Sequence, residues 1–204
     1  FFRYLEYRAP HCIEQVRQID GIPMKKTDEA LVAYLNRDEM QALLDAPDTS
    51  TVLGLRDRAM LHVAYACGLR VAELVSLRLE QFDDRVPSSI RVIGKGRRER
   101  VLPLWKETAA ALNAWLRVRP TDGATELFLN ASRRTMTRAG FEYILDKHAR
   151  VAAEKQPSIA KKHVTPHVLR HSCAMHVLQA TGDVRKVSLW LGHASIQSTE
   201  IYLR

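Results

Sequence analysis

The stretch that begins at Thr165 carries a dense series of helix start and stop signals, and these constrain the fold more than any other feature of the chain. Thr165 can cap a helix whose first position is taken by Pro166, where the missing N–H of proline costs nothing. We predict that this helix ends near Gly182. The signals that follow are, in order, an Asp183 cap, a stop at Gly192, a tight turn at His193, a Ser195 cap and a last helix that carries Tyr202.

Upstream of Thr165, the spacing of apolar residues predicts further helices and one hairpin. Asn36 can cap a helix, with Glu39 as its capping-box partner. The other predicted helices cover about 55–67, 70–77, 106–118 and 137–153. Alternating apolar residues on both sides of Gly94 and Gly96 predict a β-hairpin over 88–104, with Lys95 at its tip. The predicted fold class is therefore mainly α with a small antiparallel β-sheet.

Composition narrows the class of protein. With 46% hydrophobic and 26% charged residues, the chain fits a globular domain and not a disordered, collagen-like or disulfide-stapled one. It contains no uninterrupted apolar stretch of roughly 18 residues and no leader pattern, so we predict no membrane partner and an intracellular, cytoplasmic protein. Three cysteines without CxxC spacing, Cys12, Cys67 and Cys173, are predicted to be buried thiols.

A change in composition marks the boundary of the main domain. Residues 1–7 resemble the end of an apolar helix whose start is missing, which suggests that the chain is a fragment. The sequence turns polar at Lys25, Lys26, Thr27 and Asp28 before apolar periodicity resumes, which predicts a linker over 24–35. The main domain is expected to cover 36–204.

The charge of the chain makes nucleic acid a candidate partner. Thirty-one Lys and Arg against 23 Asp and Glu leave a formal charge of +8, with a pI of about 9.6. Such an excess attracts a polyanion at long range, but it also occurs on ordinary solvated surfaces. It therefore needs support from particular residues.

Several polar residues have the chemistry for phosphodiester cleavage. Arg70 and Arg170 can hold the non-bridging oxygens, because a planar guanidinium matches phosphate geometry. A tyrosine hydroxyl is a weak nucleophile at neutral pH, so it needs a base or a cationic pocket, which His167 and the arginines can supply. Lys95, on its glycine-flanked turn, fits the proton donor for the leaving alkoxide.

Five short motifs follow one another in a fixed order: GLRVAEL at 68–74, GKG at 94–96, HVLRH at 167–171, LGH at 191–193 and TEIY at 199–202. Together they resemble the motif set of the tyrosine recombinases, the phage integrase family, over about Asn36 to Arg204. By this resemblance Tyr202 attacks the scissile phosphate, giving a 3′-phosphotyrosyl intermediate and a free 5′-hydroxyl, with neither metal nor ATP as cofactor. The supporting roles it implies are phosphate binding by Arg70 and Arg170, general acid catalysis by Lys95, general base catalysis by His167, a hydrogen bond from His193 to a phosphate oxygen, and organisation of the pocket by Glu73.

The resemblance also implies an architecture and partners. Residues 36–204 should adopt the tyrosine recombinase catalytic-domain fold, and residues 1–23 resemble the end of a helical core-binding domain. The implied partner is double-stranded DNA, bound by a homotetramer that is monomeric without DNA, with accessory DNA-bending proteins. The implied function is site-specific recombination, for integration, excision or transposition of a mobile element. Only Leu203 and Arg204 follow the nucleophile, whereas the family usually adds a tail that docks on a neighbouring protomer.

Two basic clusters flank the proposed catalytic residues. We predict contacts to the DNA backbone from Arg97, Arg98, Arg100, Lys161 and Lys162, although each cluster is also compatible with ordinary surface charge. His171 is interpreted as a structural neighbour. His62, His148 and His176 are expected to be satisfied by local packing or solvent.

Three other functions stay open from the sequence. His167, His171 and His193 could bind zinc in a hydrolase, although no glutamate stands between the first two as in HExxH, and the arginines would repel a cation. A non-catalytic DNA-binding module would explain the charge but leave Tyr202 and Lys95 without a task. A type IB topoisomerase shares the attack chemistry but reseals the same strand.

Overall fold

The structure is a computed structural model, and it describes residues 4, 8–22, 33–82, 88–94, 99–120 and 123–192. The chain divides into two compact units, Phe1–Leu31 and Val32–Arg204. In the first unit, a short 3-10 turn, η1 (Pro10–Cys12), leads into helix α2 (Ile13–Asp20). The predicted helix end over 1–7 lies largely outside the described residues.

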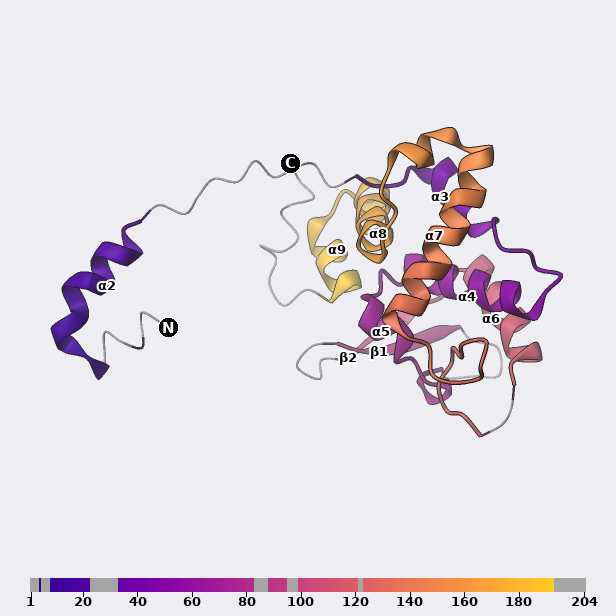
Figure 1. Cartoon of the computed structure of the whole chain (residues 1–204), viewed down its shortest axis with the longest axis horizontal. Coiled ribbons are helices and arrows are strands. Elements are labelled where there is room, and N and C mark those ends of the chain that lie inside the picture. Colours follow the sequence, from indigo (N-terminus) through magenta and orange to yellow (C-terminus); the bar gives the residue numbers. More distant parts are fainter. Residues whose placement is uncertain are drawn as a thin grey trace. The chain divides into compact units, whose positions relative to one another are not determined.

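The second unit is mainly helical with one small sheet (Figure 1). Its elements are α3 (Arg37–Leu44), α4 (Val52–Ala66), α5 (Val71–Val75), η2 (Leu79–Gln81), β1 (Ser89–Ile93), β2 (Glu99–Pro103), α6 (Lys106–Val118), α7 (Arg138–Lys155), η4 (Pro157–Lys161), α8 (Pro166–Thr181) and α9 (Val184–Leu191). The two strands pair antiparallel, with Ile93 opposite Glu99 at the turn end. This confirms the predicted fold class.

Local chemistry sets most of the helix ends where the sequence predicts them. The Asn36 side chain accepts a hydrogen bond from the Glu39 N–H, and Glu39 reciprocates to the Asn36 N–H, so the capping box is complete. Gly182 and Gly192 end α8 and α9 in the left-handed conformation, which costs glycine little. The predicted last helix with Tyr202 lies outside the described residues.

Helix α4 begins earlier than predicted. Apolar spacing suggested a start near Leu55, but the Thr51 hydroxyl accepts a hydrogen bond from the Gly54 N–H, and the helix starts at Val52. Gly54 also lies so close to the Asp48 carbonyl that a Cβ would fall 1.8 Å from its oxygen. Side-chain capping by threonine therefore overrides the apolar pattern at this end.

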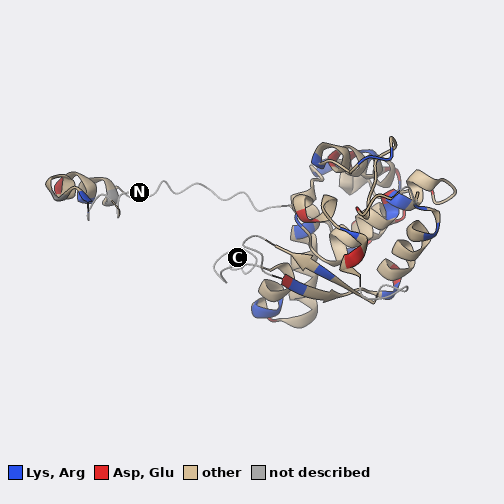
Figure 2. Ribbon diagram, turned by 90° about the horizontal axis from the view of Figure 1, so that it is seen from below, with Lys and Arg blue, Asp and Glu red and all other residues tan. Residues whose placement is uncertain are grey.

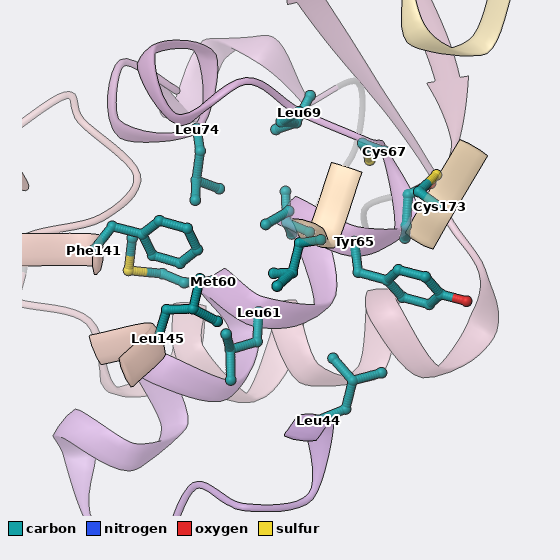
Figure 3. Packing of buried hydrophobic residues seen from close by; sticks show 14 of the residues in the cluster. Leu44, Met60, Leu61, Tyr65, Cys67, Leu69, Leu74, Phe141, Leu145 and Cys173 are labelled. Carbon is teal, nitrogen blue, oxygen red and sulfur yellow. The ribbon is translucent and has the colours of Figure 1, made fainter. Parts of the chain in front are cut away.

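Helix α4 forms the centre of the core. Its residues Met60 and Leu61 are fully buried and pack with Leu74 of α5 and with Phe141 and Leu145 of α7 (Figure 3). Helices α6 and α8 also contact α4. The C-terminal end of this buried helix, which leads to Gly68 and Arg70, is thereby held from several sides.

The cysteine prediction is partly wrong. Cys67 and Cys173 are buried, as expected, and burial raises the pKa of the Cys173 thiol to about 12. Cys12, the residue that precedes helix α2 in the small first unit, is only partly buried.

Candidate active site

Arg170 is the central side chain of the candidate site. Thr165 caps α8 by accepting a hydrogen bond from the Val168 N–H, and Pro166 opens the helix, as predicted. The Arg170 side chain is 5% exposed and donates from Nη1 to the Gly68 carbonyl and from Nη2 to the Leu191 carbonyl, at 2.9 Å in the second case. It therefore joins the turn that precedes Arg70 to the turn that precedes His193.

The turn at Gly68 needs glycine for two reasons. Its φ of +54° is left-handed, and a Cβ there would lie 2.5 Å from Leu191 Cδ2. The chain can therefore pass close to the end of α9 while it turns from α4 into α5. This turn delivers Arg70 as the N-cap residue of α5.

Arg70 and Glu73 form a compact pair in the first turn of α5. The Arg70 N–H donates to Glu73 Oε2 at 3.0 Å, and Arg70 Nη1 donates to Glu73 Oε1 at 3.0 Å. The Arg70 side chain is 41% exposed whereas that of Glu73 is 7% exposed. The guanidinium thus reaches solvent, where a phosphate can bind, while the carboxylate is buried behind it.

Arg100 is the second partner of Glu73, from strand β2. Its Nη2 donates to Glu73 Oε2 at 2.9 Å, and its Nη1 lies 3.4 Å from Oε1. Burial raises the pKa of Glu73, but the hydrogen bonds and charges of Arg100 and Arg70 outweigh it and hold the pKa below its ordinary value. The carboxylate is therefore ionised at neutral pH, and two guanidinium groups, those of Arg70 and Arg100, are paired with its negative charge.

The position of Arg100 differs from the sequence interpretation, which treated it as part of a surface cluster. Its side chain is 11% exposed and engaged in the ion pair with Glu73. No short sequence motif predicts this ion pair, because Glu73 and Arg100 are 27 residues apart. This is the feature of the site that the sequence analysis missed.

His167 lies on the first turn of α8 and is exposed, whereas Arg170, one turn later, is buried. The sequence predicted that His167 and Arg170 share one face of the helix. In the structure the two side chains differ in burial. Lys95, His193 and Tyr202, with Arg97 and Arg98, lie outside the described residues. The structure therefore brings together Arg70, Glu73, Arg100 and Arg170 among the residues that it describes.

The second basic cluster also divides into two kinds of residue. Lys161 is exposed at the end of η4. Lys162 instead donates to the Tyr34 carbonyl at 2.8 Å and to Glu39 Oε2 at 2.6 Å. Burial raises the pKa of Glu39, but the hydrogen bonds from Lys162 and Ser158 outweigh this effect and hold the pKa below its ordinary value. The Glu39–Lys162 pair is therefore ionised. Lys162 thus ties the start of the second unit to η4.

Four further histidines are buried in the described core. His148 Nε2 is 2.9 Å from Asp57 Oδ2, and His176 Nδ1 is 2.7 Å from the Tyr65 hydroxyl. His171 is buried and contacts the Tyr34 ring edge-on. Burial and the nearby Arg58 charge lower the pKa of His62 to about 4, so this ring is neutral. The expectation that local packing satisfies the ring nitrogens is met for His176 Nδ1 and His148 Nε2, whereas His148 Nδ1 and His62 Nε2 are buried with no hydrogen-bond partner among the described residues.

Basic side chains are spread over the second unit. Figure 2 shows Lys and Arg on the strands as well as on the helices, interspersed with Asp and Glu. Among the residues that the structure describes, no three His, Cys, Asp or Glu side chains form a group that could hold a metal ion. The third ligand of the zinc alternative, His193, is outside that set. No helix in the described ranges is long and apolar enough to cross a bilayer.

Comparison with known proteins gives consistent matches. The model of the phage integrase family matches residues 33–204. A tyrosine recombinase XerD of Pseudomonas putida (strain KT2440) is 39% identical over 211 residues, which cover 99% of this chain and 66% of that protein. The chain thus spans just under two thirds of the length of this curated relative.

Two solved structures share the fold. The crystal structure of XerA recombinase matches with a TM-score of 0.73 and 29% identity, over 97% of this chain and 69% of that one. XerH site-specific recombinase bound to its palindromic difH substrate, in a post-cleavage complex, matches with a TM-score of 0.74 and 24% identity, over 89% of this chain and 54% of that one.

Proposed function

The chain belongs to the phage integrase family, and from that membership we propose that it is the catalytic part of a site-specific tyrosine recombinase. It cuts and rejoins DNA strands through a covalent protein–DNA intermediate, in the integration, excision or transposition of a mobile element. Residues 36–204 form the catalytic domain, 24–35 the linker, and 1–23 the end of a core-binding domain.

One observation carries this proposal. Arg170 donates hydrogen bonds to the carbonyls of Gly68 and Leu191, which lie 102 and 21 residues away along the chain. It thereby ties the Arg70 turn to the turn that leads to His193. A guanidinium has five N–H donors, so one arginine can hold backbone carbonyls and bind a phosphate oxygen. Arg170 is thereby fixed to the turn that delivers Arg70, and two arginines held on neighbouring segments suit a pentavalent phosphoryl transition state.

The proposed chemistry balances without a metal or a nucleotide. The Tyr202 Oη–P bond forms while the P–O5′ bond of the DNA breaks. His167 takes the proton of the tyrosine hydroxyl, and Lys95 gives a proton to the departing 5′ oxygen. Arg70, Arg170 and His193 bind the non-bridging oxygens. Attack by the 5′-hydroxyl of another strand on the phosphotyrosine reverses these steps and rejoins the DNA.

Double-stranded DNA is the proposed partner. The formal charge of +8 favours a polyanion, and we retain Lys161, Arg97 and Arg98 as contacts to its backbone. Strand exchange needs several active sites at once, so we propose that the protein is a monomer without DNA and forms a homotetramer on DNA. Accessory DNA-bending proteins are proposed as further partners. Because its substrate is DNA, we propose that it acts in the cytoplasm, associated with DNA.

The test is the formation of a covalent adduct. A pool of end-labelled duplexes with randomised arms and one central nick is incubated with the chain and EDTA, without ATP, and run on a denaturing gel. The nick lets the short 5′-hydroxyl fragment leave, so the adduct accumulates. A labelled adduct with the wild type and none with Tyr202→Phe is the expected result. Retained DNA binding in Tyr202→Phe ensures that the variant is folded and competent.

Other outcomes identify the rival functions. DNA binding without any adduct would indicate a non-catalytic DNA-binding module and refute the proposal. The sequences recovered from the adducts provide a target site for a second assay with two marked duplexes. Recombinant products support the recombinase, whereas adducts with resealing of the parental strands alone would indicate a type IB topoisomerase.

A further inference from the structure

The carboxylate of Glu73 is divided between two arginines from different elements. Its Oε1 accepts from Arg70 Nη1 at 3.0 Å and from Arg100 Nη1 at 3.4 Å, and its Oε2 accepts from Arg100 Nη2 at 2.9 Å and from the Arg70 N–H at 3.0 Å. Glu73 is buried, so its charge is poorly screened by water. Each oxygen therefore has a fixed, charged donor.

This division changes what Arg70 can do. A carboxylate with a single arginine partner commonly forms a two-bond, fork-to-fork pair that occupies both sides of the guanidinium. Here Arg100 makes the two-bond pair, to Oε1 and Oε2, and among the described residues the Arg70 side chain donates to Glu73 through Nη1 alone. The other N–H groups of this partly exposed guanidinium are thus left for a phosphate.

Arg100 also packs against the turn at Gly192. A Cβ on Gly192 would lie 2.8 Å from Arg100 Nη1 and 3.1 Å from its Cδ, so the absence of a side chain lets the guanidinium lie on the backbone. The φ of Gly192 is +63°, and the residue ends α9 immediately before His193. Arg100 is therefore in contact with α5 and with the end of α9, while β2 carries it.

We propose that Arg100 is a positioning residue of the active site: it holds Glu73 so that Arg70 keeps its free donors for the scissile phosphate, and it fixes the Gly192 turn. This inference rests on the proposed function. The rival role is a direct contact from Arg100 to a DNA phosphate. That role has a candidate donor, because Arg100 Nε is buried and has no hydrogen-bond partner among the described residues.

A double-mutant cycle distinguishes the two roles. Arg100→Gln, Glu73→Gln and the double variant are compared with the wild type on a nicked duplex recovered from the adduct selection. The measurements are the single-turnover rate of adduct formation, the DNA dissociation constant at several salt concentrations, and the melting temperature. Arg150→Gln is the matched control, because it removes one arginine from an exposed ion pair with Asp146.

We expect Arg100→Gln to lower the rate of adduct formation about 10- to 100-fold, as for loss of one transition-state contact. DNA affinity should change less than about threefold, and the salt dependence should stay that of the control. In the Glu73→Gln background, Arg100→Gln should have an effect of less than about threefold, because the carboxylate charge that Arg100 pairs with is already gone. Arg100→Lys, which keeps the charge but not the fork, should retain DNA affinity and lose part of the rate.

Three results would overturn the inference. Rate losses that multiply in the double variant would show that Arg100 acts independently of Glu73. Weaker DNA binding, with a salt slope reduced by about one, would identify a direct phosphate contact. If Arg100→Gln does not fold, a full rate in Arg100→Lys would count equally against it. A wild type that forms no adduct would instead refute the proposed function, and the inference would fall with it.

Discussion

Substituting Gly68 by alanine tests the close approach on which the candidate site is built. Two costs apply at this position. The left-handed backbone at φ +54° costs an L-residue about 1–2 kcal/mol. The new Cβ would also lie 2.5 Å from Leu191 Cδ2 and 3.2 Å from Cys173 Sγ, an overpacking that costs about 1–3 kcal/mol more. We therefore expect Gly68→Ala to lower the free energy of unfolding by about 2–5 kcal/mol.

Gly182 provides a matched control. Its φ of +62° is almost the same, but nothing lies within 4 Å of the Cβ that alanine would add. Gly182→Ala should therefore cost only the backbone strain, about 1–2 kcal/mol. The difference between the two variants isolates the steric term of about 1–3 kcal/mol.

The assay is urea unfolding followed by far-UV circular dichroism, with thermal melting as a second measurement. A domain of this size shifts its melting temperature by roughly 2–4 °C per kcal/mol, so the two variants should differ by several degrees. Free energies of unfolding that agree within about 0.5 kcal/mol would refute the packing of Gly68 against Leu191. The reasoning about how Arg70 is delivered to the site would then be wrong.

Two further predictions concern buried charges. Asp57→Asn should lower the free energy of unfolding by about 3–5 kcal/mol at neutral pH, because it leaves the buried Arg56 without its counter-ion. Burial raises the pKa of Asp57, but the His148 hydrogen bond and the Arg56 charge outweigh it and hold the pKa below its ordinary 3.8. The ionised carboxylate therefore stabilises the fold fully above pH 3.8, and this stabilisation is lost as the pH falls through the lower pKa of the folded state. Urea midpoints measured from neutral pH to below pH 3.8 should fall more steeply for the wild type than for Asp57→Asn, and parallel curves would contradict this. Arg170→Ala should abolish adduct formation while it weakens DNA binding only modestly, since a transition-state contact mainly affects the rate; equal losses of rate and affinity, measured on the same duplex, would argue against its role.

The sequence predicted well those features that depend on neighbours within about four residues. The capping box of Asn36 and Glu39, the Thr165–Pro166 helix start and the glycine stops at 182 and 192 are all set by local hydrogen bonds and backbone freedom. The start of α4 was misplaced because apolar spacing reports which face is buried and not where capping begins. Motif order alone identified the family that the model match then showed.

Only the tertiary structure decided which distant residues meet. Arg100 is one more basic residue in a run of charge in the sequence, yet in the structure it is buried and paired with Glu73 of α5. Lys162 likewise forms an ion pair with Glu39, which lies 123 residues away along the chain. The residues next to a charged side chain in the sequence do not indicate which distant residue it pairs with. That pairing depends on how the helices bury their apolar faces around α4. The sequence by itself therefore determined most of the elements, most of their ends and the chemistry available, while the packing of those elements determined which charges are paired in the site and which stay exposed.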